Sequence, residues 1–196
     1  MNSEEKRTDK RKLDSRKKIK EAFISLHARE GYDAVTVSGV CNEAGISRGT
    51  FYAHFKNVTE VLDQILDEAL EGTGKFWARY LNIDPQDVAD ECRMPFCVFV
   101  RESKTYQKIF TDDAFFSRIV DKLVDRSFDK YYAFISENSS LSESELRALL
   151  GFQTSGCLSI TKMGIREGKD EWNCIRKCID GFVKRGIKGL VEPRGK

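Results

Sequence analysis

The chain has 196 residues, of which 40% are hydrophobic and 33% are charged. This length exceeds one minimal module, and the apolar fraction is sufficient for a buried core. No apolar run approaches the roughly 18 residues that a membrane-spanning helix requires, and no apolar segment of a secretion signal follows the charged N-terminus. The sequence therefore predicts a cytoplasmic protein that does not enter a membrane.

The net charge of +2 is unevenly distributed along the chain. Residues 1–58 contain 12 Lys and Arg against 8 Asp and Glu, whereas residues 59–196 contain 21 against 23. A positive end is expected where a protein meets phosphate, because bound counterions are released there. An excess of this size also arises by chance, so the charge alone does not identify a partner.

Six cysteines and two histidines are present, and no CxxC pair occurs. Cys174 and Cys178 would share one helix face, and Cys92 and Cys97 form another close pair. Two interpretations remain open, namely small buried apolar residues or a redox or thiolate-metal sensor. The spacing favours the first, so we expect neither a metal site nor a cofactor.

Helical spacing recurs throughout the chain and strand-like alternation is nearly absent, which predicts an all-α protein of about nine helices. Residues 1–12 are charged and aperiodic, so they are expected to form a flexible basic arm. A first helix is predicted over about 13–30, where apolar residues follow helical spacing, and Gly31 ends it.

Two short helices are predicted next, at 37–44 and 48–54. Thr36 and Ser47 are expected to cap their starts, and Gly45 supplies the positive φ of the turn between them. Phe51 and Phe55 are four residues apart, so both would anchor the second of these helices to the body.

A longer helix is predicted over about 59–81, with Thr59 as its cap. Asp84-Pro85 would open a further helix that Pro95 breaks or kinks. Another helix is expected from Asp112 to about 137. Ser142-x-x-Glu145 is a capping box for a helix to about 167, and a wide apolar stripe marks a last helix over about 170–191.

The outward residues of the helix at 48–54 combine a cation, hydroxyls and an imidazole. Such groups donate to phosphate oxygens and base edges, and a glycine near the helix start permits close approach of backbone to DNA. The same pattern also suits an ordinary helical hairpin with a polar outer face.

The stretch from Ile19 to Leu62 resembles the DNA-binding domain of the tetracycline-repressor (TetR/AcrR) family. The resemblance covers about a quarter of the chain and consists of an ordered series of matching pieces. These pieces are Gly31-Tyr32-Asp33, Val35-Thr36-Val37, Glu43-Ala44-Gly45-Ile46-Ser47-Arg48-Gly49-Thr50-Phe51-Tyr52 and His54-Phe55.

The resemblance implies a DNA-contacting set on these short helices. Its members are Thr36, Ser38, Ser47, Arg48, Gly49, Thr50, Tyr52, His54 and Lys56. Arg48 and Gly49 fall at the base-reading start of the recognition helix, and Thr36 falls where the family grips phosphate. Two departures are present: Val58 replaces a common phosphate-contacting lysine, and Gly39 replaces a capping acid.

The C-terminal part shows a weaker resemblance to one regulatory branch of the family, at 99–104, 151–156 and 164–168. In that family the last two helices pair with a second copy, which predicts a homodimer. The predicted interface consists of Leu149, Phe152, Ile175, Ile179, Phe182 and Val183. By the same resemblance, an effector pocket is expected among the helices that carry the aromatic residues between 76 and 134, with Trp77, Phe99, Tyr106 and Phe152 as candidate lining residues. The alternative for each of these aromatics is a place in a packed core.

Together these features predict a helix-turn-helix domain over 13–58 and an effector-binding and dimerisation domain over 59–196. The implied function is a transcriptional regulator, as a repressor that a small-molecule effector releases from a palindromic DNA operator. The alternative is a protein of the same fold that binds a protein partner. No nucleophile–base pair, metal cluster or phosphate loop is evident, so we expect no enzyme.

Overall fold

The computed structural model describes residues 3–81, 95–136, 139–165 and 167–190. These residues form nine α-helices and two short 3-10 helices, with no strand among them, so the predicted all-α fold is confirmed. Contacts divide the chain into two compact units, Met1–Ala69 and Leu70–Lys196. The division falls within the helix α4 (Val58–Leu81) rather than at its start.

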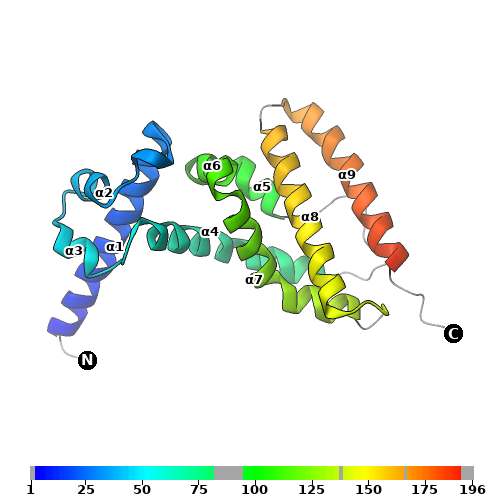
Figure 1. Ribbon diagram of the computed structural model, residues 1–196, viewed down its shortest axis with the longest axis horizontal. Coiled ribbons are helices and arrows are strands. Elements are labelled where there is room, and N and C mark those ends of the chain that lie inside the picture. Colours follow the sequence, from blue (N-terminus) through cyan, green and yellow to red (C-terminus); the bar gives the residue numbers. More distant parts are fainter. Residues whose placement is uncertain (1–2, 82–94, 137–138, 166, 191–196) are drawn as a thin grey trace. The chain divides into compact units, whose positions relative to one another are not determined.

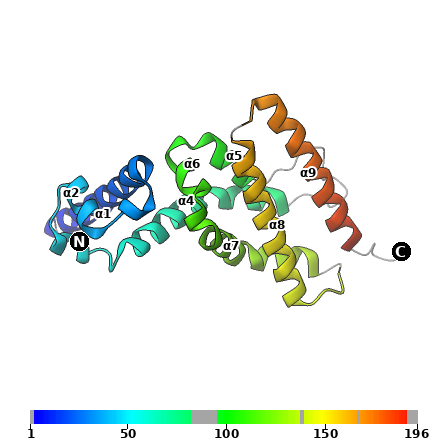
Figure 2. The same ribbon diagram turned by 45° about the horizontal axis from the view of Figure 1, so that its top comes forward.

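The first unit is built from three helices and the beginning of α4. It contains α1 (Ser3–Glu30), η1 (Tyr32–Ala34), α2 (Val37–Ala44) and α3 (Arg48–Tyr52), as Figure 1 shows. Its buried core combines one apolar face from each of these helices. The core side chains include Ile19, Phe23, Leu26, Val40, Phe51, Phe55, Leu62, Ile65 and Leu66. In Figure 2, α1 and α2 are seen to lie against each other.

The first helix is longer than expected. It begins at Ser3, so residues 3–12, which were expected to form an arm, continue the helix. The physical reason is composition: this segment is rich in Glu, Lys and Arg and contains neither glycine nor proline. The predicted end is confirmed, because Gly31 follows the last helical residue with φ +84° and donates to the carbonyl of His27 at 3.0 Å.

The start of α4 differs from the prediction in its capping residue. Asn57, not Thr59, is the cap, because its side-chain oxygen accepts the backbone N–H of Glu60 at 2.8 Å. The Glu60 carboxylate in turn accepts the backbone N–H of Lys56 at 2.6 Å. A side-chain oxygen placed three residues ahead satisfies a free N–H of the first turn, which Thr59 is too late to do.

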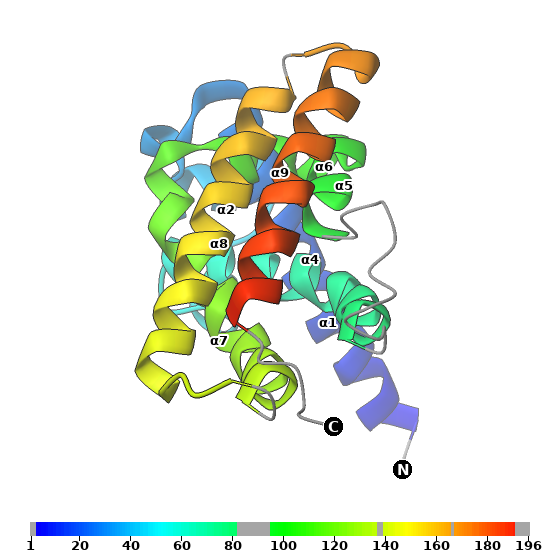
Figure 3. The same ribbon diagram turned by 90° about the vertical axis from the view of Figure 1, so that its right-hand side faces the viewer.

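The second unit continues through five more α-helices. They are α5 (Pro95–Glu102), α6 (Lys104–Thr111), α7 (Phe116–Ser136), α8 (Glu143–Gly164) and α9 (Lys169–Leu190), with η2 (Asp113–Phe115) before α7. Figure 3 shows α8 and α9 side by side and running in opposite directions. The Ser142–Glu145 capping box at the start of α8 is present as predicted.

The ends of two helices in this unit bear on local predictions. Pro95 stands at the first position of α5, where proline needs no N–H donor, and the segment that it was expected to break or kink lies outside the described residues. The predicted Asp84-Pro85 start lies outside the described residues. Asp112 caps the short η2 through the N–H of Ala114 at 2.9 Å, and α7 begins only after it.

Two apolar clusters hold the second unit together. One lies between α7 and α8 and contains Val124, Phe128, Tyr131, Ile135, Leu146 and Leu150. The other joins α5, α8 and α9 through Cys97 and Trp172, with Cys157, Ile160 and Ile175 packed against them. The wide apolar stripe of α9 is therefore only partly used within one chain.

Candidate nucleic-acid interface

The turn between α2 and α3 is fixed by two hydroxyl caps and one glycine. Thr36 accepts the backbone N–H of Gly39 at 3.0 Å, and Ser47 accepts that of Thr50 at 3.0 Å. Gly45 adopts φ 63° and ψ 40°, a left-handed conformation that favours glycine. All three predicted roles are confirmed, and together they set the direction in which α3 leaves α2.

The helix α3 is held by two phenylalanines that face the core. Phe51 and Phe55 are buried, with ring centroids 6.1 Å apart. Arg16 from α1 covers the Phe55 ring at 5.3 Å from its centroid, a cation–π contact. Tyr52 meets Phe51 edge-on at 5.5 Å, yet 56% of it remains exposed. One side of α3 is therefore anchored while the other is open to solvent.

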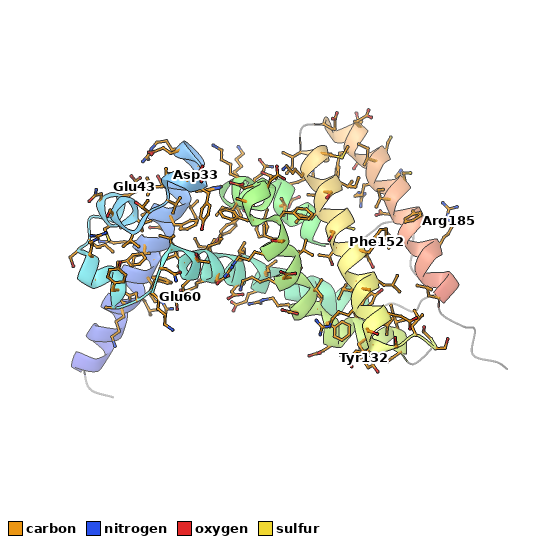
Figure 4. All side chains as sticks on the ribbon, viewed as in Figure 1. Asp33, Glu43, Glu60, Tyr132, Phe152 and Arg185 are labelled. Carbon is orange, nitrogen blue, oxygen red and sulfur yellow. The ribbon has the colours of Figure 1, made fainter. Side chains whose placement is uncertain are left out.

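A second anchor joins α1 to the end of α2 and was not anticipated from the sequence. The Arg29 guanidinium donates to both Glu43 carboxylate oxygens, at 3.2 and 3.1 Å. Ser25 also donates to Glu43, at 2.7 Å. Figure 4 shows the labelled Glu43 on α2. Because a bidentate pair fixes orientation as well as distance, it holds α2 at a set angle on α1.

These contacts shift the titration of both charged groups. Hydrogen bonds from Arg29, and then from Ser25, hold the pKa of Glu43 below its ordinary value of 4.5. Hydrogen bonds to Glu43 and Glu30 raise the pKa of Arg29 above its ordinary value. Both groups stay charged at neutral pH, so the anchor is intact there.

The structure brings the predicted contact residues together on the exposed side of α2 and α3. Thr36, Ser38, Ser47, Arg48, Gly49, Tyr52 and Lys56 are exposed, and Thr50 and His54 are half-buried. The Ser47 and Thr50 hydroxyls lie 2.9 Å apart, and Ser47 also caps the helix, so both already take part in local bonds. The open side of α3 is therefore dominated by Arg48, Gly49 and Tyr52.

Two glycines near this surface differ in their surroundings. A Cβ at Gly49 would meet only the Ser47 hydroxyl, at 3.7 Å, so the surface above α3 is free. A Cβ at Gly39 would lie 3.3 Å from both the Ala34 carbonyl oxygen and the Thr36 hydroxyl. Gly39 thus allows α2 to begin close to the preceding backbone, in a place where a side chain would crowd the cap.

The predicted effector residues are not gathered into a pocket by the described part of the chain. The side chains of Trp77 and Phe99 lie outside the described residues, and Tyr106 is half-buried beside Phe110. Phe152 is 70% exposed, so its assignment to a pocket within one chain is wrong. It points away from the core because the neighbouring Leu150 fills the buried position of α8.

A pocket does occur between α5, α8 and α9. Its lining consists of Cys97, Cys157, Ile160, Thr161, Trp172, Arg176, Ile179 and Asp180. Sequence reasoning missed Trp172, which is the residue that closes this region. The Arg101 guanidinium stacks on the Trp172 ring at 4.7 Å and also donates to the carbonyl of Gly164.

No helix in the described ranges is long and apolar enough to cross a bilayer.

Comparison with known proteins identifies the class of the first unit. Residues 19–65 match the family model for "Bacterial regulatory proteins, tetR family". Two HTH-type transcriptional regulators of Bacillus subtilis (strain 168) are similar over short stretches: YxbF is 30% identical over 66 residues, and YerO 37% over 49. The alignments cover 33% and 25% of this chain and 17% of each relative's length.

Solved structures share the fold along most of the chain. RolR in complex with resorcinol matches with a TM-score of 0.53 and 16% identity, over 95% of this chain and 98% of RolR. The dihydroxyacetone kinase operon activator DhaS gives 0.50 and 23%, over 91% and 98%. A TerR/AcrR family regulator from Aquifex aeolicus VF5 gives 0.50 and 16%, over 90% and 99%.

The class is therefore a helix-turn-helix protein with an all-helical C-terminal part. Residues 19–65 match the DNA-binding part of the bacterial tetR family of regulatory proteins, as the motifs between Ile19 and Leu62 predicted, and the rest of the chain shares the fold of the solved structures.

Proposed function

We propose that this chain regulates transcription by binding duplex DNA through the exposed side of α3. The observation that carries the proposal is the arrangement of Arg48, Gly49 and Tyr52 on an open surface of a helix whose opposite side is buried through Phe51. A helix presented in this way enters the major groove with its N-terminal residues toward the base edges. Anchoring on the other side limits the freedom that binding would otherwise have to remove.

Each exposed residue has a role that follows from its chemistry. Arg48 is suited to a bidentate contact with a guanine edge, and Gly49 lets the helix backbone come close to the DNA. Thr36, Tyr52 and Lys56 would contact the phosphate backbone, which positions the protein without reading sequence. Ser38 and His54 would add further donors. Ser47 and Thr50 support the site as caps and present their remaining hydrogen-bonding capacity to phosphate.

We further propose that two copies act together. A dimer places two recognition helices about 34–36 Å apart, one turn of DNA, which selects a palindromic operator. The apolar stripe of α8 and α9 supports this, because Phe152 and Phe182 are 70% and 64% exposed in the single chain. Leu149, Ile175, Ile179 and Val183 are half-buried around them. A second copy seated on this face would cover the exposed rings.

Regulation would follow from a small molecule bound in the second unit of this cytoplasmic protein. A ligand that prefers a conformer with wider-spaced recognition helices shifts the population away from DNA, which is repression relieved by an effector. RolR, which shares the fold, binds resorcinol, a flat aromatic molecule, and this supports an aromatic-lined site here, for which Trp77, Phe99 and Tyr106 remain candidates. DhaS is an operon activator, so activation is the competing direction of control.

One observation favours a second candidate, a protein-binding adaptor. Val58 stands where the family commonly has a phosphate-contacting lysine, so one DNA anchor is missing at the start of α4. Lys56 is exposed two residues earlier and supplies a cation close by. We prefer DNA binding because the residues between 47 and 56 follow the order of the family's DNA-contacting residues. An adaptor that binds protein would not require that order.

Selection from a library of random DNA duplexes at low salt separates the two functions. The DNA regulator predicts that the retained duplexes share two inverted half-sites, with centres about one helical turn apart. The chain with Arg48→Ala and Lys56→Ala serves as the control and should retain no common sequence. Duplexes retained by the unaltered chain without any shared sequence would overturn the proposal.

A further inference from the structure

Two thiols stand on the outer face of α9. Cys174 and Cys178 are exposed and free of disulfides, and they lie four positions apart within a continuous helix. Side chains four apart on a helix are neighbours, with Cβ atoms about 5–6 Å from each other. Because both side chains are exposed and share one face of the helix, a rotation about χ1 can bring their sulfur atoms toward one another, so that they hold one ligand between them.

The other described cysteines are in a different situation. Cys41 and Cys97 are buried, and burial raises the pKa of Cys41. Burial, followed by the nearby Cys97 and Asp180, raises the pKa of Cys157 to about 12. Because the thiolate is the form that bonds to soft elements, Cys157 is held in its unreactive form. Among the cysteines that the structure describes, Cys174 and Cys178 are thus the thiols that a dissolved reagent reaches first.

The number of donors decides which ligands such a pair takes. Among the described residues there is no group of three or more His, Cys, Asp or Glu that could hold a metal ion. A structural tetrahedral zinc site needs four protein ligands, and the described part of the chain does not supply them around Cys174 and Cys178. Two sulfur donors match a soft element that requires only two bonds from the protein.

We propose that Cys174 and Cys178 form a dithiol site for trivalent organoarsenicals, in which arsenic carries one organic group and needs two sulfur ligands. With an arsenic oxide of this class, two As–S bonds form and the oxide oxygen leaves as water with the two thiol protons. Arsenic stays in the +3 state, so no oxidant or reductant takes part. Phe182, one turn further along the same face and 64% exposed, offers an apolar surface for an aryl substituent.

The position of the site has a consequence for assembly, which rests on the proposed dimer. Phe182 belongs to the stripe that a second copy would cover, so an arsenical bound beside it would occupy part of that surface. Ligand and partner would then compete, and binding of one lowers the affinity for the other. The dithiol chemistry itself does not depend on the dimer or on DNA.

Intact-protein mass measurement with phenylarsine oxide tests the site on the full chain. One adduct per chain is expected to survive excess 2-mercaptoethanol and to be removed by a dithiol, because a second bond within the same molecule strengthens binding by about 100-fold or more. Cys174→Ser and Cys178→Ser should each lose the resistant adduct. Cys157→Ser, with the same number of thiols as these variants, should keep it.

A resistant adduct in either of the first two variants, or its loss in Cys157→Ser, would overturn the assignment. The mass measurement uses no DNA, so failure of the proposed regulator function leaves its result unaffected. Sedimentation of the adduct against the unlabelled chain tests the competition separately. A shift toward monomers supports it, and an unchanged distribution overturns the competition alone.

Discussion

Arg29 near the end of α1 and Glu43 near the end of α2 form a bidentate ion pair, with N···O distances of 3.2 and 3.1 Å. The pair lies on the partly exposed surface of the first unit, and Ser25 donates a third hydrogen bond to the same carboxylate at 2.7 Å. It therefore links the long helix to the segment that leads into the recognition helix.

The lowered pKa of Glu43 gives this link a defined pH dependence. A carboxyl group with a folded-state pKa below its ordinary value of 4.5 stabilises the fold above that value, and loses the effect as pH falls through the folded-state pKa. Glu43→Gln should flatten this acid-side loss in denaturant titrations between neutral pH and about pH 3. The Glu145 carboxyl, whose pKa Ser142 lowers, contributes a remaining loss of the same sign.

Glu21→Gln is the matched control for that experiment, because Glu21 is an exposed glutamate of α1 that pairs with Lys17 at 3.8 Å. It should leave the acid-side loss in place. Equal pH curves for Glu43→Gln and the unaltered chain would show that the ion pair is not formed in solution.

Gly45 and Gly49 provide a pair of substitutions that separates folding from binding. Gly45→Ala forces a side chain into a left-handed conformation and should destabilise the first unit by about 1–2 kcal/mol. The methyl group of Gly49→Ala would contact no atom closer than the Ser47 hydroxyl at 3.7 Å, and alanine favours a helix more than glycine does. This variant should therefore leave the thermal midpoint unchanged or raise it. Both would be measured by circular dichroism on heating.

The Gly49→Ala variant also tests DNA binding. It should lower operator affinity about tenfold, because the added methyl group would hold the helix away from the base edges and at least one hydrogen bond to a base would be lost. A stable Gly49→Ala protein with undiminished affinity would mean that this part of α3 does not approach DNA.

In the second unit, Gly164 lies directly under the Trp172 ring. A Cβ at Gly164 would overlap Trp172 Cε3, so Gly164→Ala must displace the ring and, with it, the stacked Arg101. Overpacking of this kind costs about 1–3 kcal/mol or more. Gly156→Ala, in the same helix with nothing near its Cβ, should instead stabilise by about 0.5–1 kcal/mol.

Urea titration of the two variants checks this contrast. The tryptophan fluorescence of Gly164→Ala should also change, because Trp172 would lose its buried position. If both alanine variants have the same midpoint, the close packing of Trp172 on Gly164 is absent in solution.

Dimer formation is tested at Phe182. Because this ring is exposed in the single chain, Phe182→Glu should preserve the helical content while converting dimers to monomers in sedimentation. Operator affinity should fall with it, since one half-site alone contributes far fewer contacts. Tyr132→Glu, at an exposed ring of α7, is expected to leave the dimer intact.

Sequence patterns were sufficient for features that depend on neighbouring residues. The caps at Thr36, Ser47 and Ser142 and the turn at Gly45 each need only a few consecutive positions, and all are confirmed. The start of α4 was misjudged because two residues two positions apart compete for one role, and Asn57 reaches the free N–H whereas Thr59 does not.

Features that depend on distant parts of the chain could not be read in this way. Arg29 and Glu43 are separated by a turn and a helix, and Trp172 meets Arg101 only after α9 packs beside α8. Phe152 was assigned both to a pocket and to a dimer surface, since periodicity places a residue on a face without saying what that face meets. Because Phe152 is exposed in the single chain, its assignment to the dimer surface stays a prediction.

The central claim is that the open side of α3 reads duplex DNA, and the most direct test is the ratio of specific to non-specific affinity. This ratio would be measured for the unaltered chain and for Arg48→Ala at several salt concentrations, on a selected operator and on a scrambled duplex. We predict tighter binding to the operator, weakening as salt rises, and a ratio that falls about tenfold or more in Arg48→Ala. Absence of duplex binding even at low salt, or an unchanged ratio in the variant, would contradict the claim.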